Sequence, residues 1–318
     1  MSVTIALAGN PNCGKTTMFN ALTGANQYVG NWPGVTVEKK EGKLKNQKDV
    51  TVTDLPGIYS LSPYTLEEVV SRDYLLKEKP DVIIDLVDAT NIERNLYLAT
   101  QLLEIGIPVV IALNMVDLLK KNNIHINVKG LSSALGCPIV ETSALKGTGL
   151  KEVVDEAIKC ANQHRVPSKQ MEFPKAVEKA VNEIEGFVPA NIAEENKRWY
   201  AVKLLERDSK VKEGLNLPAS AQSRIEEIAS GLEKAEDDDT ESIVTDGRYQ
   251  YIQKVVSANV KRSGNKMTVS DKIDRIVTNR VLGLPIFILT MFIVYYVSVT
   301  TVGTCLLYTS DAADEEDS

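Results

Sequence analysis

Cysteine, histidine and surplus positive charge are all scarce in this sequence. Its 318 residues include four cysteines and two histidines. The cysteines are widely spaced and form no Cys-x-x-Cys pair, which argues against a cysteine-rich zinc site and is typical of a reducing compartment. The histidines, His125 and His164, have no cysteine or carboxylate neighbours at metal-ligand spacing. The composition therefore excludes the common zinc-binding classes.

The balance of charge gives a second exclusion. The formal net charge is -7, whereas proteins that bind nucleic acids carry a basic patch or stripe that we do not find here. We therefore expect no nucleic-acid partner. The N-terminus enters an apolar run, Val3–Ala8, with neither a basic leader nor a cleavable apolar segment, so we expect no secretory signal.

Short apolar runs alternate with helical patterns over the first half of the chain. The segments with strand character are Ser2–Ala8, Thr36–Leu44, Asp49–Asp54, Asp81–Asp88, Pro108–Asn114 and Pro138–Thr142. Several of them are continuous apolar runs, as parallel strands covered by helices on both faces require. Helical spacing marks the segments between them, Leu66–Lys79, Ile92–Ile105, Val128–Leu135 and Leu150–Ala161. We therefore expect an α/β domain over residues 1–165, with a six-stranded, mostly parallel sheet.

Residues 166–262 have a different pattern. Strand signals fade, and alanine, isoleucine, glutamate and lysine recur at helical spacing. The predicted helices are Pro174–Ile184, Ala193–Leu205, Ala219–Leu232 and Glu241–Val260. The acidic cluster at 236–239 is expected to be solvated and not to form a metal site. This region predicts a second, all-helical domain.

The last part of the chain has membrane character. No charged residue occurs from Val281 to Ser310, and about 20 apolar residues suffice to span a bilayer. We expect a transmembrane helix over 281–308, with a buried core helix as the alternative. Lysines and arginines make 263–280 a basic juxtamembrane linker, which places the preceding domains in the cytoplasm. Residues 309–318 end the apolar run abruptly, and we interpret them as a truncation or fusion scar.

A phosphate-binding loop is predicted near the N-terminus. Gly9–Thr16, with the sequence GNPNCGKT, lies between an apolar strand and a segment that favours a helix. Its glycines let several backbone N–H groups point at one phosphate, Lys15 adds a charge near the β and γ oxygens, and Thr16 offers a hydroxyl to Mg²⁺. An ordinary glycine-rich turn is the alternative, but the strand before and the helix after favour a nucleotide site.

Two later strand ends extend this prediction. Asp54 and Gly57 follow one predicted strand, where a carboxylate lies beside Mg²⁺ and a backbone N–H near the γ-phosphate. Asp117 follows another, and its carboxylate can accept both N1–H and the exocyclic amine of guanine. Adenine has an acceptor at N1, so it gains nothing from Asp117. Ser143 and Ala144 end the last strand and can supply contacts to the guanine oxygen. Together these residues favour GTP over ATP.

These motifs resemble those of the translation-factor-like small GTPases, which implies a Ras-like P-loop fold. By this resemblance Thr36 is the switch I threonine, which reaches Mg²⁺ and the γ-phosphate only in the GTP state. The segment Tyr28–Thr36, with the sequence YVGNWPGVT, gives a narrower match. Together with the phosphate loop and Ser270–Arg275 before an apolar helix, it resembles the ferrous iron transport protein B family over Met1–Tyr296. The resemblance implies a GTPase domain, a helical spacer and the first membrane helix of an Fe²⁺ transporter.

The chain departs from the Ras-like pattern in ways that affect mechanism. Met115 replaces the usual lysine, so we expect modest nucleotide affinity and fast exchange. Ile58 replaces the water-orienting glutamine, and neither the phosphate loop nor switch I contains arginine. In the resembling family a potassium ion bound by Asn12 and by switch I carbonyls, here those of Gly30 and Trp32, takes the place of an arginine finger. A side chain that only caps the loop is the alternative role for Asn12.

The predicted site is therefore extensive. The nucleotide-binding residues are expected to be Gly9, Asn10, Asn12, Cys13, Gly14, Lys15, Thr16, Thr17, Asp54, Gly57, Asn114, Met115, Asp117, Ser143 and Ala144. The residues expected to act in hydrolysis are Lys15, Thr36 and Gly57. Mg²⁺ is assigned to Thr16, Thr36 and Asp54, and K⁺ to Asn12, Gly30 and Trp32. Trp32 is also costly to expose in a mobile loop, so we expect it to guard the nucleotide or dock on a partner.

The leading hypothesis is a slow, K⁺-stimulated GTPase that gates Fe²⁺ uptake from the cytoplasmic side of the cell's inner membrane. When full length it is expected to be multi-pass, since one membrane helix cannot enclose an ion path. Its expected partners are GTP and GDP, the transported Fe²⁺ and the lipid bilayer, and self-association stays open. The alternatives are a membrane-tethered regulatory GTPase that acts on another protein or RNA, and a soluble ATPase, which Asp117 disfavours.

Overall fold

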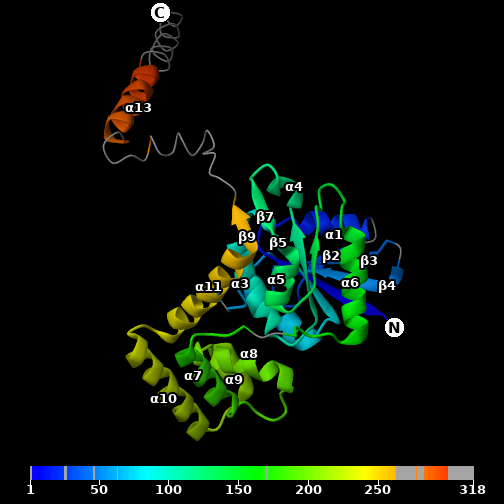
Figure 1. The fold of residues 1–318 in the computed structure, drawn as a ribbon, viewed down its shortest axis with the longest axis vertical. Coiled ribbons are helices and arrows are strands. Elements are labelled where there is room, and N and C mark those ends of the chain that lie inside the picture. The colour runs from blue at the N-terminus through cyan, green and yellow to red at the C-terminus, as the bar shows by residue number, and fades with distance from the viewer. Residues whose placement is uncertain are drawn as a thin grey trace, which may run out of the picture. The chain divides into compact units, whose positions relative to one another are not determined.

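The structure is a computed structural model, and it describes residues 2–24, 27–45, 47–62, 64–168, 171–262, 277 and 283–299. The chain divides into two compact units, Met1–Ser263 and Gly264–Ser318. The first unit contains a seven-stranded sheet, the helices that cover it and a group of further helices (Figure 1). The predicted boundary between residues 165 and 166 falls inside this unit and stays a prediction.

The sheet confirms the expected fold class. Its strands are β1 (Val3–Gly9), β2 (Gln27–Asn31), β3 (Glu38–Leu44), β4 (Gln47–Asp54), β5 (Val82–Asp88), β6 (Val109–Asn114) and β8 (Ile139–Glu141). They are ordered β2-β3-β4-β1-β5-β6-β8, and the pairs from β4 to β8 are parallel. Buried strands β1, β5 and β6 are the continuous apolar runs seen in the sequence.

The sheet has one more strand than expected. Strand β2 has the sequence QYVGN, which is too polar and too short to stand out, and it lies at the edge of the sheet, where only one neighbour must pair with it. It forms an antiparallel hairpin with β3, with Gly30 opposite Lys39. Strand β3 begins at Glu38, two residues later than predicted, because 32–37 form the hairpin loop.

Helices cover both faces of the sheet. They are α1 (Lys15–Thr23), α2 (Leu66–Asp73), α3 (Ile92–Leu103), α4 (Val116–Leu119), α5 (Val128–Leu135) and α6 (Leu150–Gln163), with short η1 (Tyr74–Glu78) and η2 (Ala89–Asn91). The predicted helix Leu66–Lys79 is an α-helix that continues as a π-helical turn, η1. Helix α5 has the predicted bounds, since the Asn127 side chain caps its start and Gly136 ends it with a φ of 72°.

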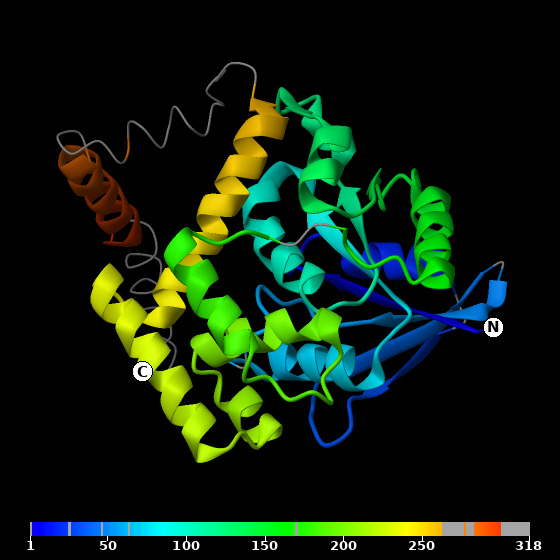
Figure 2. The same ribbon diagram turned by 60° about the horizontal axis from the view of Figure 1, so that its bottom comes forward.

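A helical region follows the sheet domain in sequence. It consists of α7 (Lys175–Glu185), α8 (Glu194–Leu205), α9 (Ser209–Leu215), α10 (Ala219–Glu236) and α11 (Thr240–Asn259). Helix α9 was not predicted, because seven residues carry too little periodicity. Both views show α11 running from this region alongside α3 (Figures 1 and 2). Helix α11 ends at β9 (Val260–Arg262), which pairs with β7 (Ile124–Ile126). The helical region is therefore tied back to the sheet domain through backbone pairing.

Two buried ion pairs also join the helical region to the sheet domain. Arg248 of α11 donates two hydrogen bonds to the Glu104 carboxylate, at 2.7 and 3.0 Å, and both side chains are almost fully buried. Arg72 of α2 donates to Asp208, which caps α9, at 2.7 Å. Breaking one partner of such a buried pair leaves an uncompensated charge. The region after β4, which includes the predicted γ-phosphate sensor Gly57, is therefore linked to α9 through α2.

The second unit contains α13 (Gly283–Val297), an uncharged apolar helix. Across the described ranges, no helix is both long enough and apolar enough to cross a bilayer. Residues 281–282 and 300–308 of the predicted span, the basic linker apart from Val277, and the predicted scar at 309–318 lie outside the described residues.

A buried acid lies in the centre of the sheet. Asp85 stands on β5, in register with Ala8 of β1 and Ile111 of β6, and its Oδ2 has no hydrogen-bond partner within the described part of the chain. Burial raises the pKa of Asp85 to about 7, whereas an unfolded aspartate has a pKa of about 3.9. The folded state therefore holds a proton that the unfolded state has lost. Stability falls as pH rises from about 4 to about 7 and stays at the lower value above that.

We therefore predict that Asp85→Asn stabilises the fold at neutral and alkaline pH. At pH 8 the free energy of unfolding should rise by roughly 2–4 kcal/mol, because the ionised carboxylate is no longer buried. At pH 4 the difference should nearly vanish. Urea unfolding at both pH values measures this, with the exposed Asp49→Asn on β4 as the matched control. A variant no more stable than the wild type at pH 8 would show that Asp85 finds a partner in solution.

Candidate functional site

The phosphate loop occupies the turn between β1 and α1. Its backbone is left-handed at Asn12 and Gly14, with φ of 66° and 95°. A Cβ on Gly14 would lie 2.5 Å from Asn114 Nδ2, so this position requires glycine. Helix α1 begins at Lys15, and no side chain of the described residues caps its first turn. The free N–H groups of that turn, together with the loop, form a site suited to an anion.

Lys15 and Asp54 come together at the ends of α1 and β4. Lys15 Nζ lies 2.5 Å from Asp54 Oδ1, and both side chains are at most one-tenth exposed. Burial raises the pKa of Asp54, although Lys15 opposes this shift. Thr16 is exposed beside them. A buried carboxylate next to an ammonium group and a free hydroxyl is a set of groups able to hold a phosphate with its divalent cation.

Asn114 connects the phosphate loop to the loop after β8. Its Nδ2 donates to the Cys13 carbonyl at 2.8 Å, while its Oδ1 accepts from the Ala144 N–H at 2.9 Å. Asn114 is buried. The sequence predicts Asn114 as part of a base-binding motif. Its two hydrogen bonds also fix the spacing between the phosphate end and the base end of the site.

Asp117 sits at the base end of the site. Its Oδ1 accepts from Ser143 Oγ at 2.9 Å, and its Oδ2 lies 3.3 Å from Lys146 Nζ. The Ser143 hydrogen bond lowers the pKa of Asp117, so the group is an acceptor at neutral pH. Met115 adopts a left-handed φ of 64°, and its methyl group is 4.0 Å from where a Cβ on Gly14 would lie. Leu145 follows Ser143 and Ala144 in the loop that the sequence assigns to the guanine oxygen, and it is 85% exposed.

The predicted γ-phosphate sensor lies against the phosphate loop. A Cβ on Gly57 would be 3.2 Å from Pro11 Cα, and the next residue, Ile58, donates its N–H to the Gly9 carbonyl at 3.3 Å. Arg94 of α3 is a residue that the sequence did not reveal. Its guanidinium lies over the Tyr59 ring at 4.4 Å, and its carbonyl accepts from Asn10 Nδ2 at 3.4 Å. Only the three-dimensional fold places Arg94 here, because no motif surrounds it.

The predicted switch I residues make no hydrogen bond or ion pair to this cluster, over the ranges that the structure describes. Thr36 is exposed in the loop between β2 and β3, and among the described residues no hydrogen bond or ion pair joins it to Lys15 or Asp54. Gly30 is paired within the β2–β3 ladder, and the Trp32 carbonyl accepts from the Val35 N–H at 3.2 Å. Asn12 is exposed. Hydrogen bonds and ion pairs among the described residues thus link Lys15 with Asp54, the phosphate loop with Asn114, and Asp117 with Ser143, but none joins Thr36, Gly30 or Trp32 to them.

Trp32 was expected to guard the nucleotide or dock on a partner because an exposed tryptophan in a loop is costly. In the structure its side chain is buried instead. Its side chain is 7% exposed and packs edge-on against Tyr74, with 5.3 Å between ring centroids. Lys39 lies over the indole at 5.1 Å. Trp32 lies in the loop between β2 and β3, and its side chain reaches the core because it packs against Tyr74 of η1. The sequence alone did not indicate this contact.

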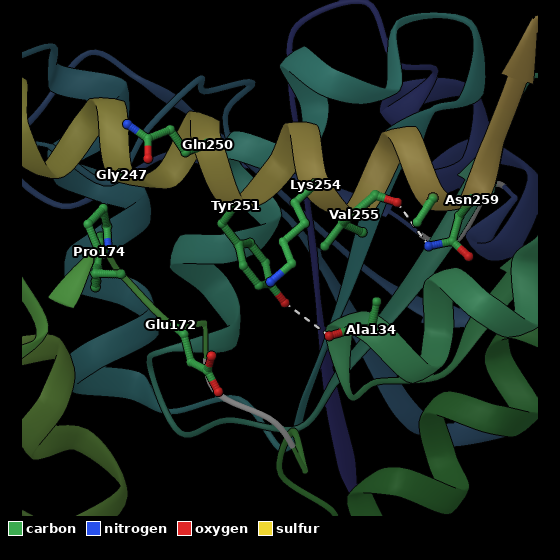
Figure 3. A pocket seen from close by; sticks show the side chains of 11 residues that line it. Ala134, Glu172, Pro174, Gly247, Gln250, Tyr251, Lys254, Val255 and Asn259 are labelled. Carbon is green, nitrogen blue, oxygen red and sulfur yellow. Dashed lines mark hydrogen bonds between the residues drawn. The ribbon is translucent and has the colours of Figure 1, made fainter.

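A separate pocket lies between α5 and α11 (Figure 3). Tyr251 crosses it and donates from its hydroxyl to the Ala134 carbonyl at 2.9 Å, with Lys254 and Glu172 at its rim. None of its lining residues belongs to the predicted nucleotide site. The pocket therefore plays no part in the chemistry described above.

Two family descriptions match the chain. Residues 3–157 match "Ferrous iron transport protein B", and residues 173–261 match "FeoB cytosolic helical domain". The Fe(2+) transporter FeoB of Escherichia coli K12 is 39% identical over 314 residues, which cover 95% of this chain and 39% of that protein. A fusion of Fe(2+) transport protein A and FeoB in Porphyromonas gingivalis is 40% identical over 308 residues, covering 92% and 36%. The chain thus spans about 39% of the length of the curated relatives that it matches first.

Solved structures match the first unit closely. The GDP-bound G domain of S. thermophilus FeoB, in a mutant form, is 47% identical with a TM-score of 0.79, covering 81% of this chain and all of that one. The N-terminal part of the same protein bound to GDP, AlF4- and K+ is 48% identical with a TM-score of 0.74, covering 80% and 99%.

Proposed function

Because the chain belongs to the ferrous iron transport protein B family, we propose that its first unit binds and hydrolyses GTP and that the complete protein carries Fe²⁺ across a membrane. The observation that carries the first part is the cluster of Lys15, Asp54, Asn114 and Asp117 at one edge of one sheet. The second part rests on relatives that are much longer than this chain. Hydrolysis in one unit would then regulate transport through the rest of the protein.

The residues of this chain fit a magnesium nucleotide. Asp54 is a buried carboxylate, and Thr16 offers an exposed hydroxyl at the start of α1. Thr36 would join them once switch I closes. When bound, Mg²⁺ neutralises charge on the β- and γ-phosphate oxygens. Lys15 exchanges its ion pair with Asp54 for phosphate oxygens, and the N–H of Gly57 donates to the γ-phosphate. Asp117 accepts from the guanine N1–H and amine, while Met115 covers the base.

Potassium is proposed as the second cation, in the place of an arginine finger. The relative crystallised with GDP and AlF4- also holds K⁺. In this chain Asn12 presents an exposed amide within the phosphate loop, and the carbonyls of Gly30 and Trp32 would complete the set. Both carbonyls belong to the β2–β3 hairpin, so the hairpin must rearrange before they can serve as ligands. The ion would supply positive charge at the β–γ bridge, where charge develops.

The substitution Asp117→Asn tests the choice of base. An asparagine amide can donate to the 2-oxo group of xanthine but loses the charged acceptor for the guanine amine. We expect GTP affinity to fall by about 10²-fold, the loss of a charged hydrogen-bonded contact, and XTP affinity to rise. Competition of GTP, XTP and ATP against a fluorescent GDP measures this. Asp155→Asn on α6 is the matched control, and unchanged GTP affinity in Asp117→Asn would contradict the proposal.

A regulatory GTPase without transport is the alternative. Iron uptake by cells that carry the complete gene separates the two, when wild type is compared with the same Asp117→Asn substitution. Coupled transport predicts that uptake by the cells falls when GTP affinity falls. In vesicles that contain the Asp117→Asn protein, uptake should partly recover when XTP is supplied. Unchanged uptake would rule out coupling while leaving the GTPase intact. The inner-membrane location, multi-pass topology, lipid contact and self-association belong to the same proposal for the complete protein.

A further inference from the structure

Trp32 is the best-buried side chain of the β2–β3 hairpin loop. It belongs to an apolar cluster that also contains Leu55, Ile58 and Leu61, the residues around and after Gly57. Its ring meets Tyr74 edge-on, and the Tyr74 hydroxyl donates to Thr53 Oγ1 at 3.1 Å, one residue before Asp54. The indole is therefore linked through Tyr74 and Thr53 to the strand end that carries Asp54.

The backbone of Trp32 also makes two hydrogen bonds within the hairpin loop. The Trp32 N–H donates to the Val37 carbonyl at 2.9 Å, and its carbonyl accepts from the Val35 N–H at 3.2 Å. These hydrogen bonds close the loop so that Thr36 lies in solvent. A carbonyl that accepts from Val35 in this turn is not free to turn toward a cation at the phosphate loop.

The buried indole of Trp32 carries one polar atom, Nε1. Trp32 Nε1 is buried and has no hydrogen-bond partner among the described residues. A buried donor left without an acceptor offsets part of the stabilisation that burial of the ring provides. The contact between Trp32 and Tyr74 therefore stabilises the hairpin only modestly. A contact that forms and breaks reversibly requires such a small free-energy difference.

We propose that Trp32 is a latch between the β2–β3 hairpin loop, which contains Thr36, and the segment from Leu55 to Tyr74 that follows β4. With the indole seated on Tyr74, the hairpin keeps Thr36 away from the nucleotide and holds the Trp32 carbonyl in its own loop; closure of switch I over GTP withdraws the indole from the apolar cluster. This inference rests on the proposed GTPase function and adds an autoinhibitory contact to it. The cation-bound and latched forms compete because the same loop conformation that seats the indole directs the Trp32 carbonyl to the Val35 N–H, so the hairpin must rearrange before that carbonyl can face the phosphate loop.

Intrinsic fluorescence reports on the latch directly, since the chain has two tryptophans. The variant Trp199→Phe leaves Trp32 as the single fluorophore. With GDP and Mg²⁺ we expect blue-shifted emission that acrylamide quenches poorly. On addition of AlF4⁻ and KCl, emission should shift to the red and the quenching constant should rise several-fold. If Trp199→Phe does not fold, the difference between wild type and Trp32→Phe supplies the same signal.

Binding of a fluorescent GDP and release of phosphate from GTP are measured on the same samples. A protein that neither binds nor hydrolyses nucleotide would overturn the proposed function. A protein that hydrolyses GTP while Trp32 stays blue-shifted and protected would overturn the latch alone. The two failures are thereby distinguished.

A kinetic test substitutes the two aromatic residues that are in contact, Trp32 and Tyr74. Trp32→Ala and Tyr74→Ala each remove one side of the contact, so each should lower the K⁺ concentration for half-maximal hydrolysis by about fivefold to tenfold, as expected when a competing state loses roughly 1 kcal/mol. The double variant should gain little more than either single one. Tyr28→Ala, exposed on the same hairpin, is the control. An unchanged or higher K⁺ requirement in Trp32→Ala would contradict the latch.

Discussion

Lys15→Ala should hydrolyse GTP about 10²- to 10³-fold more slowly than the wild type, the usual loss when a preorganised charge at the reacting group is removed. Lys15 is the one cation that the structure places within the phosphate loop and against Asp54, in the part of the chain that it describes. Single-turnover phosphate release measures the rate. The substitution also leaves Asp54 buried without its partner, so its pKa should rise further.

The control for this prediction is Lys159→Ala, which removes an exposed lysine of α6. Thermal unfolding of Lys15→Ala is measured at pH 5 and pH 8, because the unpaired Asp54 is tolerated better when it is protonated. Adding Asp54→Asn to Lys15→Ala should recover part of the stability but none of the activity. Hydrolysis within threefold of wild type in a folded Lys15→Ala protein would sink the proposed role of the loop.

The second large effect is expected at Asn12. Because its φ is 66°, alanine would strain the loop, and Asn12→Gly is the better way to delete the amide. We expect this variant to lose the stimulation by K⁺, about 10- to 10²-fold in rate when a single charge-stabilising ligand site is removed, while its rate in NaCl stays near that of the wild type.

Asn12→Asp is the informative companion, since aspartate also tolerates a left-handed backbone and keeps an oxygen ligand. It should retain a response to K⁺. If Asn12→Gly is stimulated by K⁺ as strongly as the wild type, Asn12 only caps the loop and the cation acts elsewhere.

The phosphate, magnesium and base residues could be placed from the sequence because each follows a strongly apolar strand. The carboxyl ends of parallel strands meet at one edge, so Gly9, Asp54 and Asn114 had to converge there. Chain order and burial alone sufficed for that prediction. The fold class followed for the same reason.

The edge of the sheet and the hairpin could not be placed in the same way. The sequence of β2 has neither an apolar run nor clear alternation, and the seat of Trp32 depends on Tyr74, 42 positions later in the chain by residue number. Likewise, the helix predicted over Glu241–Val260 ends at Asn259, and the sequence did not indicate that Val260 begins β9 and pairs with Ile126. Contacts of this kind are set by tertiary packing, which overrides local propensity.

The most direct test is release of labelled phosphate from GTP by the wild-type chain in KCl, with and without a hundredfold excess of unlabelled ATP. A guanine-specific site built on Asp117 predicts that ATP leaves the rate unchanged. A rate that falls in proportion to the added ATP would contradict it.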